Sequence, residues 1–518
     1  MGIFKKLIKH FFSKNYQNQG KAMQIPEQVN LVSPIIYNIN ESINKQINPP
    51  INNSPWKFQV DRYSGGGYNP QSIEGIAATT HVTIANILNE TMGVMPEMLD
   101  KQWKETGELL VYPFAGQGLN AFYNRKYLAF FYDKDENDEW FFTSSSHDIV
   151  AHELGHAILD ILRPDLWNAA SLEIWAFHEA FGDIISMLSL MLYPEVVEQV
   201  LNLTGGDLRK NNLISDVGEK FGKILFNKNY LRSGINNFRY VDPQVLPKTS
   251  SDDQLSKEPH SFSRIFTGAI YDIFVMMYED LKQHFDEKES IRIARNILAR
   301  YLGKAVSYAP ASVRFFEAMA KTMLWVDFIE DKPWHDRMQK IFIDRKILPE
   351  IQALNLQTSN LFGSEPSGMV TVCHSKKEKL CHCNSKMKIQ SVDEFSDVQL
   401  EILRTDAYIH DLEGNLIDTH HVEEKTALDA AVDLVEFLKT NKQISDDPLT
   451  PFEVYKGQLK RSLICCCSGG RTPLKSSPEY YKQYKPENQA GCCGGSTQKT
   501  NQTKKKIKRG CYIRYSIK

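Results

Sequence analysis

The sequence predicts an α+β fold in which a strand-rich part and a helical part meet at one long helix. Short runs rich in aromatic and β-branched residues fill the chain before residue 145, and such runs are typical of strands. One helical segment follows, between the serines at 144–146 and Arg163-Pro164. After it, apolar residues recur at helical spacing to about residue 350.

Length and composition favour an ordinary globular protein. The chain has 518 residues, 42% hydrophobic and 24% charged, enough for two or three domains. The 61 Lys and Arg nearly balance the 63 Asp and Glu, so the charge does not indicate a nucleic acid as partner. No stretch approaches the roughly 18 apolar residues that span a bilayer, so no transmembrane segment is expected.

The cysteines and the N-terminus indicate in which cellular compartment the protein is expected. All nine cysteines lie at residue 373 or later, whereas disulfides of a secreted protein normally staple its core. Residues 1–12 carry interrupting lysines and no cleavage site follows them, so they do not resemble a secretory signal. A cytoplasmic location is expected, although secretion by another route stays open. As a basic amphipathic helix, residues 1–12 would make weak contact with a membrane.

The strand-rich part is expected over residues 56–165 and the helical part over residues 166–350. Strands are expected at 108–114, 121–123, 127–132 and 140–143, with a helix around 77–88. The later helices are expected at 172–193, 263–284, 289–302, 311–320 and 334–346.

Three flanking regions differ in composition. Residues 1–55 are rich in Asn, Gln, Ile and Pro, which predicts a flexible leader. Residues 351–462 are expected to form an appended α+β region, with a β-ribbon at 397–421 and an amphipathic helix at 426–438. Residues 463–518 are rich in Cys and Lys and are expected to be a disordered tail. The Cys and His residues at 373–383 lack the spacing of a zinc site, which favours loose thiols.

The long helix carries the clearest chemical signal, His152-Glu153-Leu154-Gly155-His156. Residues four apart lie on one helix face, so His152 and His156 can offer imidazole nitrogens to one ion. Glu153 is offset and can reach a water on that ion without binding the ion. This H-E-x-x-H pattern is typical of a zinc peptidase, although a solvated helix face carrying the same residues would look alike.

A catalytic zinc needs a third protein ligand and one position left for water. Glu179 is the candidate, since it follows His156 by enough residues for a helix–loop–helix return. Asp183 lies four residues further on the same face and can accept the free N–H of a ligand histidine. Glu173 is an alternative ligand, but it lacks a carboxylate partner at that offset.

With these motifs the chain resembles the thermolysin family of zinc metalloendopeptidases. The segment His178-Glu179-Ala180-Phe181-Gly182-Asp183 is similar to the second family motif, a Glu and an Asp four apart. Asn120-Ala121-Phe122-Tyr123 resembles the family's edge strand, whose backbone pairs with the peptide substrate. His260-Ser261-Phe262-Ser263 resembles the segment whose histidine stabilises the oxyanion. The four matches span roughly residues 60–350.

The resemblance implies a thermolysin-like two-lobed metallopeptidase, with a strand-rich N-lobe, a central zinc helix and a helical C-lobe. It implies Zn²⁺ bound by His152, His156 and Glu179, with Glu153 as general base and His260 as oxyanion donor. It also implies that Asn120 and Ala121 bind substrate.

The chain departs from the family pattern at several places. The position of an oxyanion-binding Tyr is held by Trp167, whose indole can donate. Arg239, before Asp242-Pro243, is the best candidate for the substrate-orienting arginine. Leu255 replaces the Asp that orients the catalytic histidine, which leaves Asp252, Asp253 or Glu258 for that role.

The family's calcium site is not favoured in this chain. Asp148 matches one of its ligands, but Leu190 stands where another carboxylate belongs, and calcium prefers oxygen ligands.

Two functions follow from these observations. The first is a zinc endopeptidase that cleaves a peptide or protein substrate with a zinc-activated water and a Glu general base. The alternative is a weakly active or inactive metallopeptidase-like scaffold that acts as a binding protein. The altered positions at Trp167 and Leu255 keep this alternative open.

Overall fold

The computed structural model describes residues 54–349, with gaps at 64, 66–71, 104–106, 136–137, 139, 165, 169–170, 219–221, 223–229, 310 and 331, and only the backbone of seven short strands beyond 349. Almost all of the expected leader, the expected helix at 426–438 and the tail at 463–518 lie outside the described residues. So do the side chains of the cysteine and histidine cluster at 373–383.

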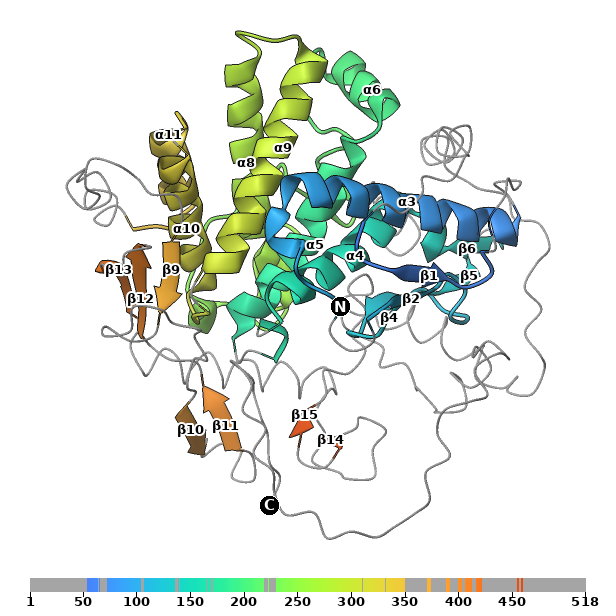
Figure 1. Ribbon diagram of the computed structural model, residues 1–518, viewed down its shortest axis with the longest axis horizontal. Coiled ribbons are helices and arrows are strands. Elements are labelled where there is room, and N and C mark those ends of the chain that lie inside the picture. The colour runs from blue at the N-terminus through green and yellow to red at the C-terminus, as the bar shows by residue number, and fades with distance from the viewer. Residues whose placement is uncertain are drawn as a thin grey trace.

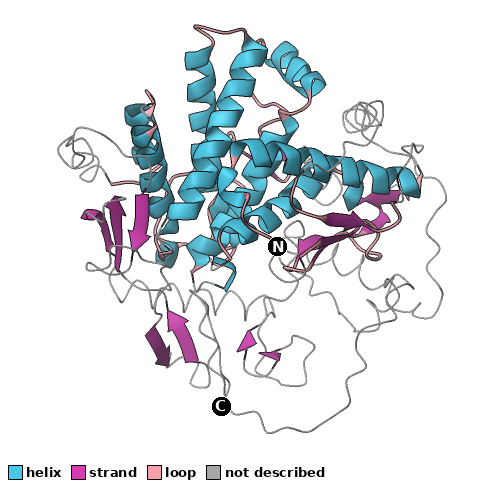
Figure 2. Ribbon diagram, viewed as in Figure 1, coloured by secondary structure: helices cyan, strands magenta, loops and turns pink. Residues whose placement is uncertain are grey.

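The described residues are a mixture of helices and small sheets, which confirms the α+β class. Figure 2 shows strands β1–β4 beside one end of the helical core. A strand-rich part is followed by helices, as the sequence predicts. The principal elements are β1 (Phe58–Val60), α3 (Ile73–Val94), β2 (Leu109–Tyr112), β3 (Ala121–Tyr123), β4 (Tyr127–Phe130), β5 (Tyr132–Lys134), β6 (Trp140–Phe142), α4 (His147–Leu162), α5 (Leu172–Leu190), α6 (Pro194–Thr204), β7 (Asp216–Val217), β8 (Arg232–Ser233), α8 (Pro259–Leu281), α9 (Glu287–Tyr308), α10 (Phe315–Ile329) and α11 (His335–Asp344).

The largest described sheet has four strands in the order β1-β2-β4-β3, so β3 is an edge strand. β1 and β4 run parallel to β2, and β3 pairs with β4 as an antiparallel hairpin. α3 runs along this sheet (Figure 1) and contacts β1, while α4 contacts β3. Side chains on one face, such as Leu109 and Leu128, join the main core, and Phe122 and Ala129 form a small apolar cluster on the other.

Helices α4 and α5 form the centre of the molecule, and every one of their residues is buried. They pack against each other, and α5 also packs against α8. A helix that is buried all round carries apolar residues on every face, and α5 does so from Leu172 to Leu190. The polar residues within these two helices therefore have to find their partners inside the protein.

The remaining helices extend this core, and one of them was not predicted. α8, α9, α10 and α11 pack in succession along the chain. α6 was missed, although Pro194 lies in its first turn and Gly205 ends it with a φ of 64°, which are the usual signals for a helix start and stop. Its buried face is formed by valines and one leucine, Val196, Val197, Val200 and Leu201.

Within the described part of the chain, no single helix is long and apolar enough to cross a membrane. Taken together, α5 and α6 pass that test by length and composition, but they are bent by 93°.

The predicted β-ribbon at 397–421 is confirmed in its second half. β12 (Asp406–Asp411) and β13 (Leu416–His421) pair antiparallel around the predicted turn, whereas β11 (Gln399–Ile402) pairs with β10 (Lys388–Ser391).

Glu173, at the start of α5, joins two later segments of the chain. Its carboxylate accepts hydrogen bonds from the backbone N–H of Phe316 at 2.7 Å and from the Tyr240 hydroxyl at 3.1 Å. Glu173 is only 2% exposed. Burial raises its pKa to about 7, although the positive charge of Arg314 opposes the shift.

Glu173→Gln should stabilise the protein at pH 8 and leave its stability nearly unchanged at pH 5. A carboxyl with a raised folded-state pKa stabilises the fold when protonated, and loses that contribution as pH rises through about 7. Gln resembles the protonated form, so the gain at pH 8 should approach about 3 kcal/mol at most. Chemical unfolding at both pH values checks this prediction. Glu195→Gln is the control, because Glu195 is exposed on α6. A variant less stable than wild type at pH 8 would contradict it.

Candidate metal centre

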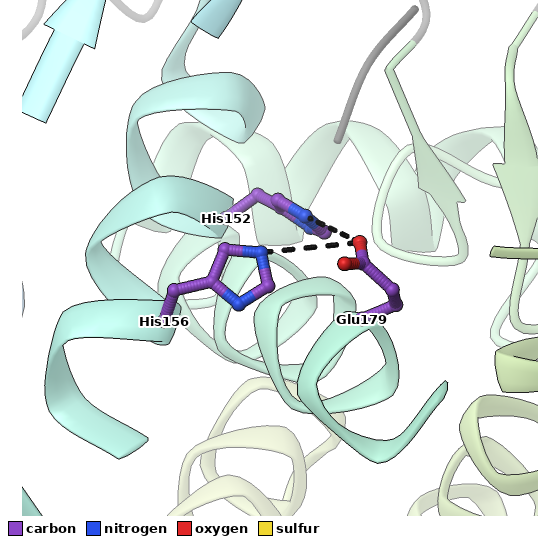
Figure 3. Close-up of side chains that lie close together, drawn as sticks. All are labelled: His152, His156 and Glu179. Atoms are coloured by element: carbon purple, nitrogen blue, oxygen red, sulfur yellow. Dashed lines mark ion pairs between the residues drawn. The ribbon is translucent and has the colours of Figure 1, made fainter. Parts of the chain in front are cut away.

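His152 and His156 lie one turn apart on α4, with their rings facing the same side (Figure 3). The ring centroids are 4.8 Å apart and the planes are nearly perpendicular. Both residues are 1% exposed. The helix forms where expected, but the hydroxyl of its N-cap, Ser146, donates to the carboxylate of Asp148 instead of capping the backbone.

Glu179 on α5 completes a group of three. Its Oε2 lies 3.5 Å from Nε2 of His152 and 3.9 Å from Nε2 of His156, as Figure 3 shows. One ligand atom from each residue lies within 4.8 Å of the others. Three such side chains so close together can hold a metal ion, and we call His152, His156 and Glu179 the metal group. Glu173, the alternative ligand, is held elsewhere by Tyr240 and Phe316.

Two glycines allow α4 and α5 to approach this closely. A Cβ on Gly155 would lie 2.9 Å from the Cα of Gly182, and a Cβ on Gly182 would lie 2.8 Å from the His152 ring. Real Cβ atoms essentially never come that close to another heavy atom. The imidazole of His152 therefore occupies space that any larger residue at 182 would need.

Asp183 orients His152, as the sequence predicts for it. Its Oδ1 is 2.9 Å from Nδ1 of His152, which leaves Nε2 to face Glu179. Arg232 on β8 donates to both oxygens of Asp183, at 2.7 and 2.6 Å. Burial would raise the pKa of Asp183, but Arg232 and His152 outweigh it and lower this pKa to about 2. Asp183 is therefore a carboxylate that lies against Nδ1 of His152 on one side and is held by Arg232 on the other.

His260 approaches the same place from the first turn of α8. Its Nε2 lies 3.2 Å from Oε2 of Glu179, and its Nδ1 contacts Oε1 of Glu258. Glu258 is the N-cap of α8 and its other oxygen accepts the N–H of Ser261 at 2.9 Å. Of the three residues that the sequence left open to orient His260, the structure places Glu258 against it.

The carboxylates around them raise the pKa of two imidazoles, those of His152 and His260. Burial would lower the pKa of His152, but hydrogen bonds with Asp183 and Glu179 raise it to about 10. Burial would likewise lower the pKa of His260, but Glu179 and Glu258 raise it to about 9. The pocket therefore favours positive charge.

The three-residue group can hold a metal ion, and its donors can be compared with those of a zinc site. In a tetrahedral site with bonds of about 2.0–2.2 Å, ligand atoms lie roughly 3.3 Å apart, and the nitrogen–oxygen separations of 3.5 and 3.9 Å are close to that value. Two imidazoles and one carboxylate are also a donor set that catalytic zinc uses. Glu153 is fully buried, and its charge contributes to the raised pKa of His152.

Two of the predicted substrate-binding residues lie at β3, which contacts α4, and the third lies between α4 and α5. Asn120 and Ala121 are buried at the start of β3, and the outer edge of β3 carries no described strand. Trp167 is buried, with its ring edge-on to Tyr123 and His178 at centroid distances of 5.4 and 5.7 Å.

The structure does not bring Arg239 to the metal group. Its side chain is exposed, and the described residues provide it with no hydrogen bond or ion pair. The arginine that contacts Asp183, and through it His152, is Arg232, which sequence reasoning missed. No local spacing links Arg232 to Asp183, 49 residues earlier, so only the folded chain reveals the pair.

The residues that match the calcium site do not fit a calcium ion. The Asp148 carboxylate already accepts the N–H groups of Ile149 at 2.9 Å and of Gly218 at 2.6 Å, besides the Ser146 hydroxyl. Leu190 is buried in the apolar core and offers no oxygen.

No protein-family model matches the chain, and the search of curated proteins gives no match either. The likeness to zinc metallopeptidases therefore depends on the motifs and on the geometry of the metal group.

Asp183→Asn should weaken zinc binding by roughly 10–100-fold while leaving the three proposed ligands in place. The amide has one oxygen and no negative charge, so it cannot accept hydrogen bonds from both His152 and Arg232 as the carboxylate does. Competition with a chromogenic chelator measures the zinc affinity. Asp344→Asn is the matched control, because Asp344 is exposed on α11. An unchanged zinc affinity in Asp183→Asn would refute the orienting role.

Added calcium should leave the thermal midpoint of the protein unchanged, because N–H donors already use the Asp148 carboxylate and Leu190 supplies no ligand. Thermal unfolding in calcium, compared with magnesium at equal ionic strength, checks this. A rise specific to calcium would show that other oxygens complete a site.

Proposed function

We propose that this protein is a zinc-dependent endopeptidase. The observation that supports it most is the convergence of His152, His156 and Glu179 from two buried helices, with Glu153 one residue from the first histidine. A purely structural zinc site is normally closed by four protein ligands. Here three residues form the group, and a general base and a histidine donor lie beside it.

The arrangement of elements agrees with a thermolysin-like two-lobed enzyme. The sheet that ends in β3 precedes α4, and the helices from α5 onward follow it. In such an enzyme the substrate lies between the strand-rich and helical parts, next to the central helix. The proposal assigns this place to the region between β3 and the residues of α5 and α8 that face the metal group.

A zinc ion held by the three residues would polarise the scissile carbonyl and acidify a water. Glu153 accepts the proton of the attacking water and passes it to the leaving amine, so no proton is lost in the cycle. Its burial keeps the carboxylate away from bulk solvent.

His260 donates Nε2–H to the oxyanion as it forms. Glu258 contacts Nδ1 and so holds the ring in one orientation, which is the preorganisation that oxyanion stabilisation requires. Arg232 is anchored through Asp183, and its positive charge lies close enough to act on His260.

The substrate is proposed to bind as an extended strand on the outer edge of β3. Backbone pairing of this kind gives affinity without sequence specificity. It suits an enzyme whose substrates are unfolded proteins or peptides.

A metal-binding scaffold without catalysis is the competing function. The observation that favours it is Trp167, whose indole ring packs between Tyr123 and His178 at the position where an oxyanion donor is expected. Activity measurements on the zinc-loaded protein separate the two.

Glu153→Gln should retain zinc and the fold but lose about 100–10,000-fold in kcat, since the amide cannot accept the proton of water. Cleavage of unfolded casein and zinc content, measured on the same sample, test this. Glu195→Gln is the control, and a chelator should abolish wild-type cleavage. Full activity in Glu153→Gln would refute the mechanism, and a zinc-loaded wild type that cleaves nothing would favour the scaffold.

A further inference from the structure

Asp160 lies on the same face of α4 as His152 and His156. It follows His156 by four residues, as His156 follows His152, so all three lie on one face of the helix. Asp160 is 1% exposed. A buried carboxylate requires charged or hydrogen-bonding partners, and those of Asp160 come from another element.

The partners of Asp160 belong to the β3–β4 hairpin. Arg125 holds it with two hydrogen bonds, from Nη2 to Oδ1 at 2.7 Å and from Nε to Oδ2 at 3.0 Å. The Tyr123 hydroxyl donates to Oδ2 at 3.1 Å. Nη2 of Arg125 also reaches the carbonyl of Pro164, just beyond α4, at 3.3 Å. The hairpin is thus tied to the helix at one carboxylate.

Arg125 occupies a backbone conformation that favours glycine. Its φ is 72°, in the left-handed region where side chains are strained. The turn itself is held by Asn124, whose Oδ1 accepts the N–H groups of Lys126 at 3.1 Å and Tyr127 at 3.0 Å. The turn therefore needs no arginine, and the ion pair with Asp160 accounts for a large residue at this position.

Trp167 links the same contacts to the metal group. The Arg125 guanidinium lies 5.6 Å from the centroid of its ring, and Tyr123 lies edge-on to it. The ring also meets His178, whose own ring centroid is 6.0 Å from that of His156. Side-chain packing is therefore continuous from the hairpin to a metal ligand.

We propose that Asp160 is a positioning residue for the substrate: with Arg125 and Tyr123 it forms a latch that holds the β3 edge in register with the metal-binding face of α4. The inference depends on the proposed peptidase function. A peptide paired with β3 takes its position over the metal group from the position of β3. A displacement of the peptide by about 1 Å can lower the reaction rate roughly 100-fold.

The latch predicts an effect that depends on substrate length. Peptides long enough to pair with β3 gain from its position, whereas a blocked dipeptide makes few contacts with the strand. Without the latch, kcat/KM should fall about 10–100-fold for hexapeptides and change little for the dipeptide. A loss of folded protein would lower both equally.

The variant that tests this is the double substitution Arg125→Gly and Asp160→Asn. It removes both charges together, so neither is left buried alone, and glycine suits the backbone at position 125. Lys126→Ala, exposed in the same turn, is the control. Arg125→Lys keeps the charge but loses the paired geometry, and serves if the double variant does not fold. Zinc content and thermal midpoint are measured for each.

Hexapeptide affinity for the zinc-loaded Glu153→Gln protein, with and without the double substitution, provides a readout without catalysis. Loss of the hexapeptide advantage with zinc retained supports the latch. Unchanged length dependence in the double variant, or in Arg125→Lys if that variant alone folds, overturns it. A wild type that cleaves nothing but binds hexapeptides through the latch would refute the peptidase function alone. A protein that binds no hexapeptide would refute both.

Discussion

The close approach of α4 and α5 is the constraint on which the rest of the site depends. Gly155 and Gly182 leave no room for a Cβ where the two helices meet, and the His152 ring lies directly over Gly182. This contact brings Glu179 within reach of both histidines. A wider separation would leave the three residues on the same helices but out of range of one ion.

The same burial creates an electrostatic cost that the fold has to offset. Glu153, Glu179 and Asp183 are all buried, and carboxylates in an apolar interior destabilise a protein unless they are paired. Arg232 neutralises one of them, and the carboxylates in turn raise the pKa of His152 and of His260.

Sequence reasoning succeeded where spacing along one helix decides the geometry. His152 and His156, and likewise Glu179 and Asp183, are four apart on α4 and α5, so their shared faces could be predicted. The partner of His260 was left open among three residues because Leu255 replaces the expected Asp, and α8 was expected to begin at residue 263. It begins at Pro259, which makes Glu258 its N-cap and places it beside His260.

Contacts that depend on tertiary packing could not be predicted in this way. Arg232 lies on a two-residue strand, and nothing near it in the sequence indicates that its partner is Asp183. The pairing of Arg125 with Asp160 likewise joins a turn and a helix 35 residues apart. In the sequence, both arginines were indistinguishable from solvated surface residues; the fold shows Arg232 buried and Arg125 partly buried.

The complete burial of α4 and α5 also determines how the site can be lost. Helices at a surface fray from their ends, and their backbone amides exchange with solvent through small local openings. Here neither helix exposes a residue, so their slowest amides exchange only when the whole core opens. A metal ion held between them would add to the free energy of that opening, because it binds the folded state and not the unfolded chain.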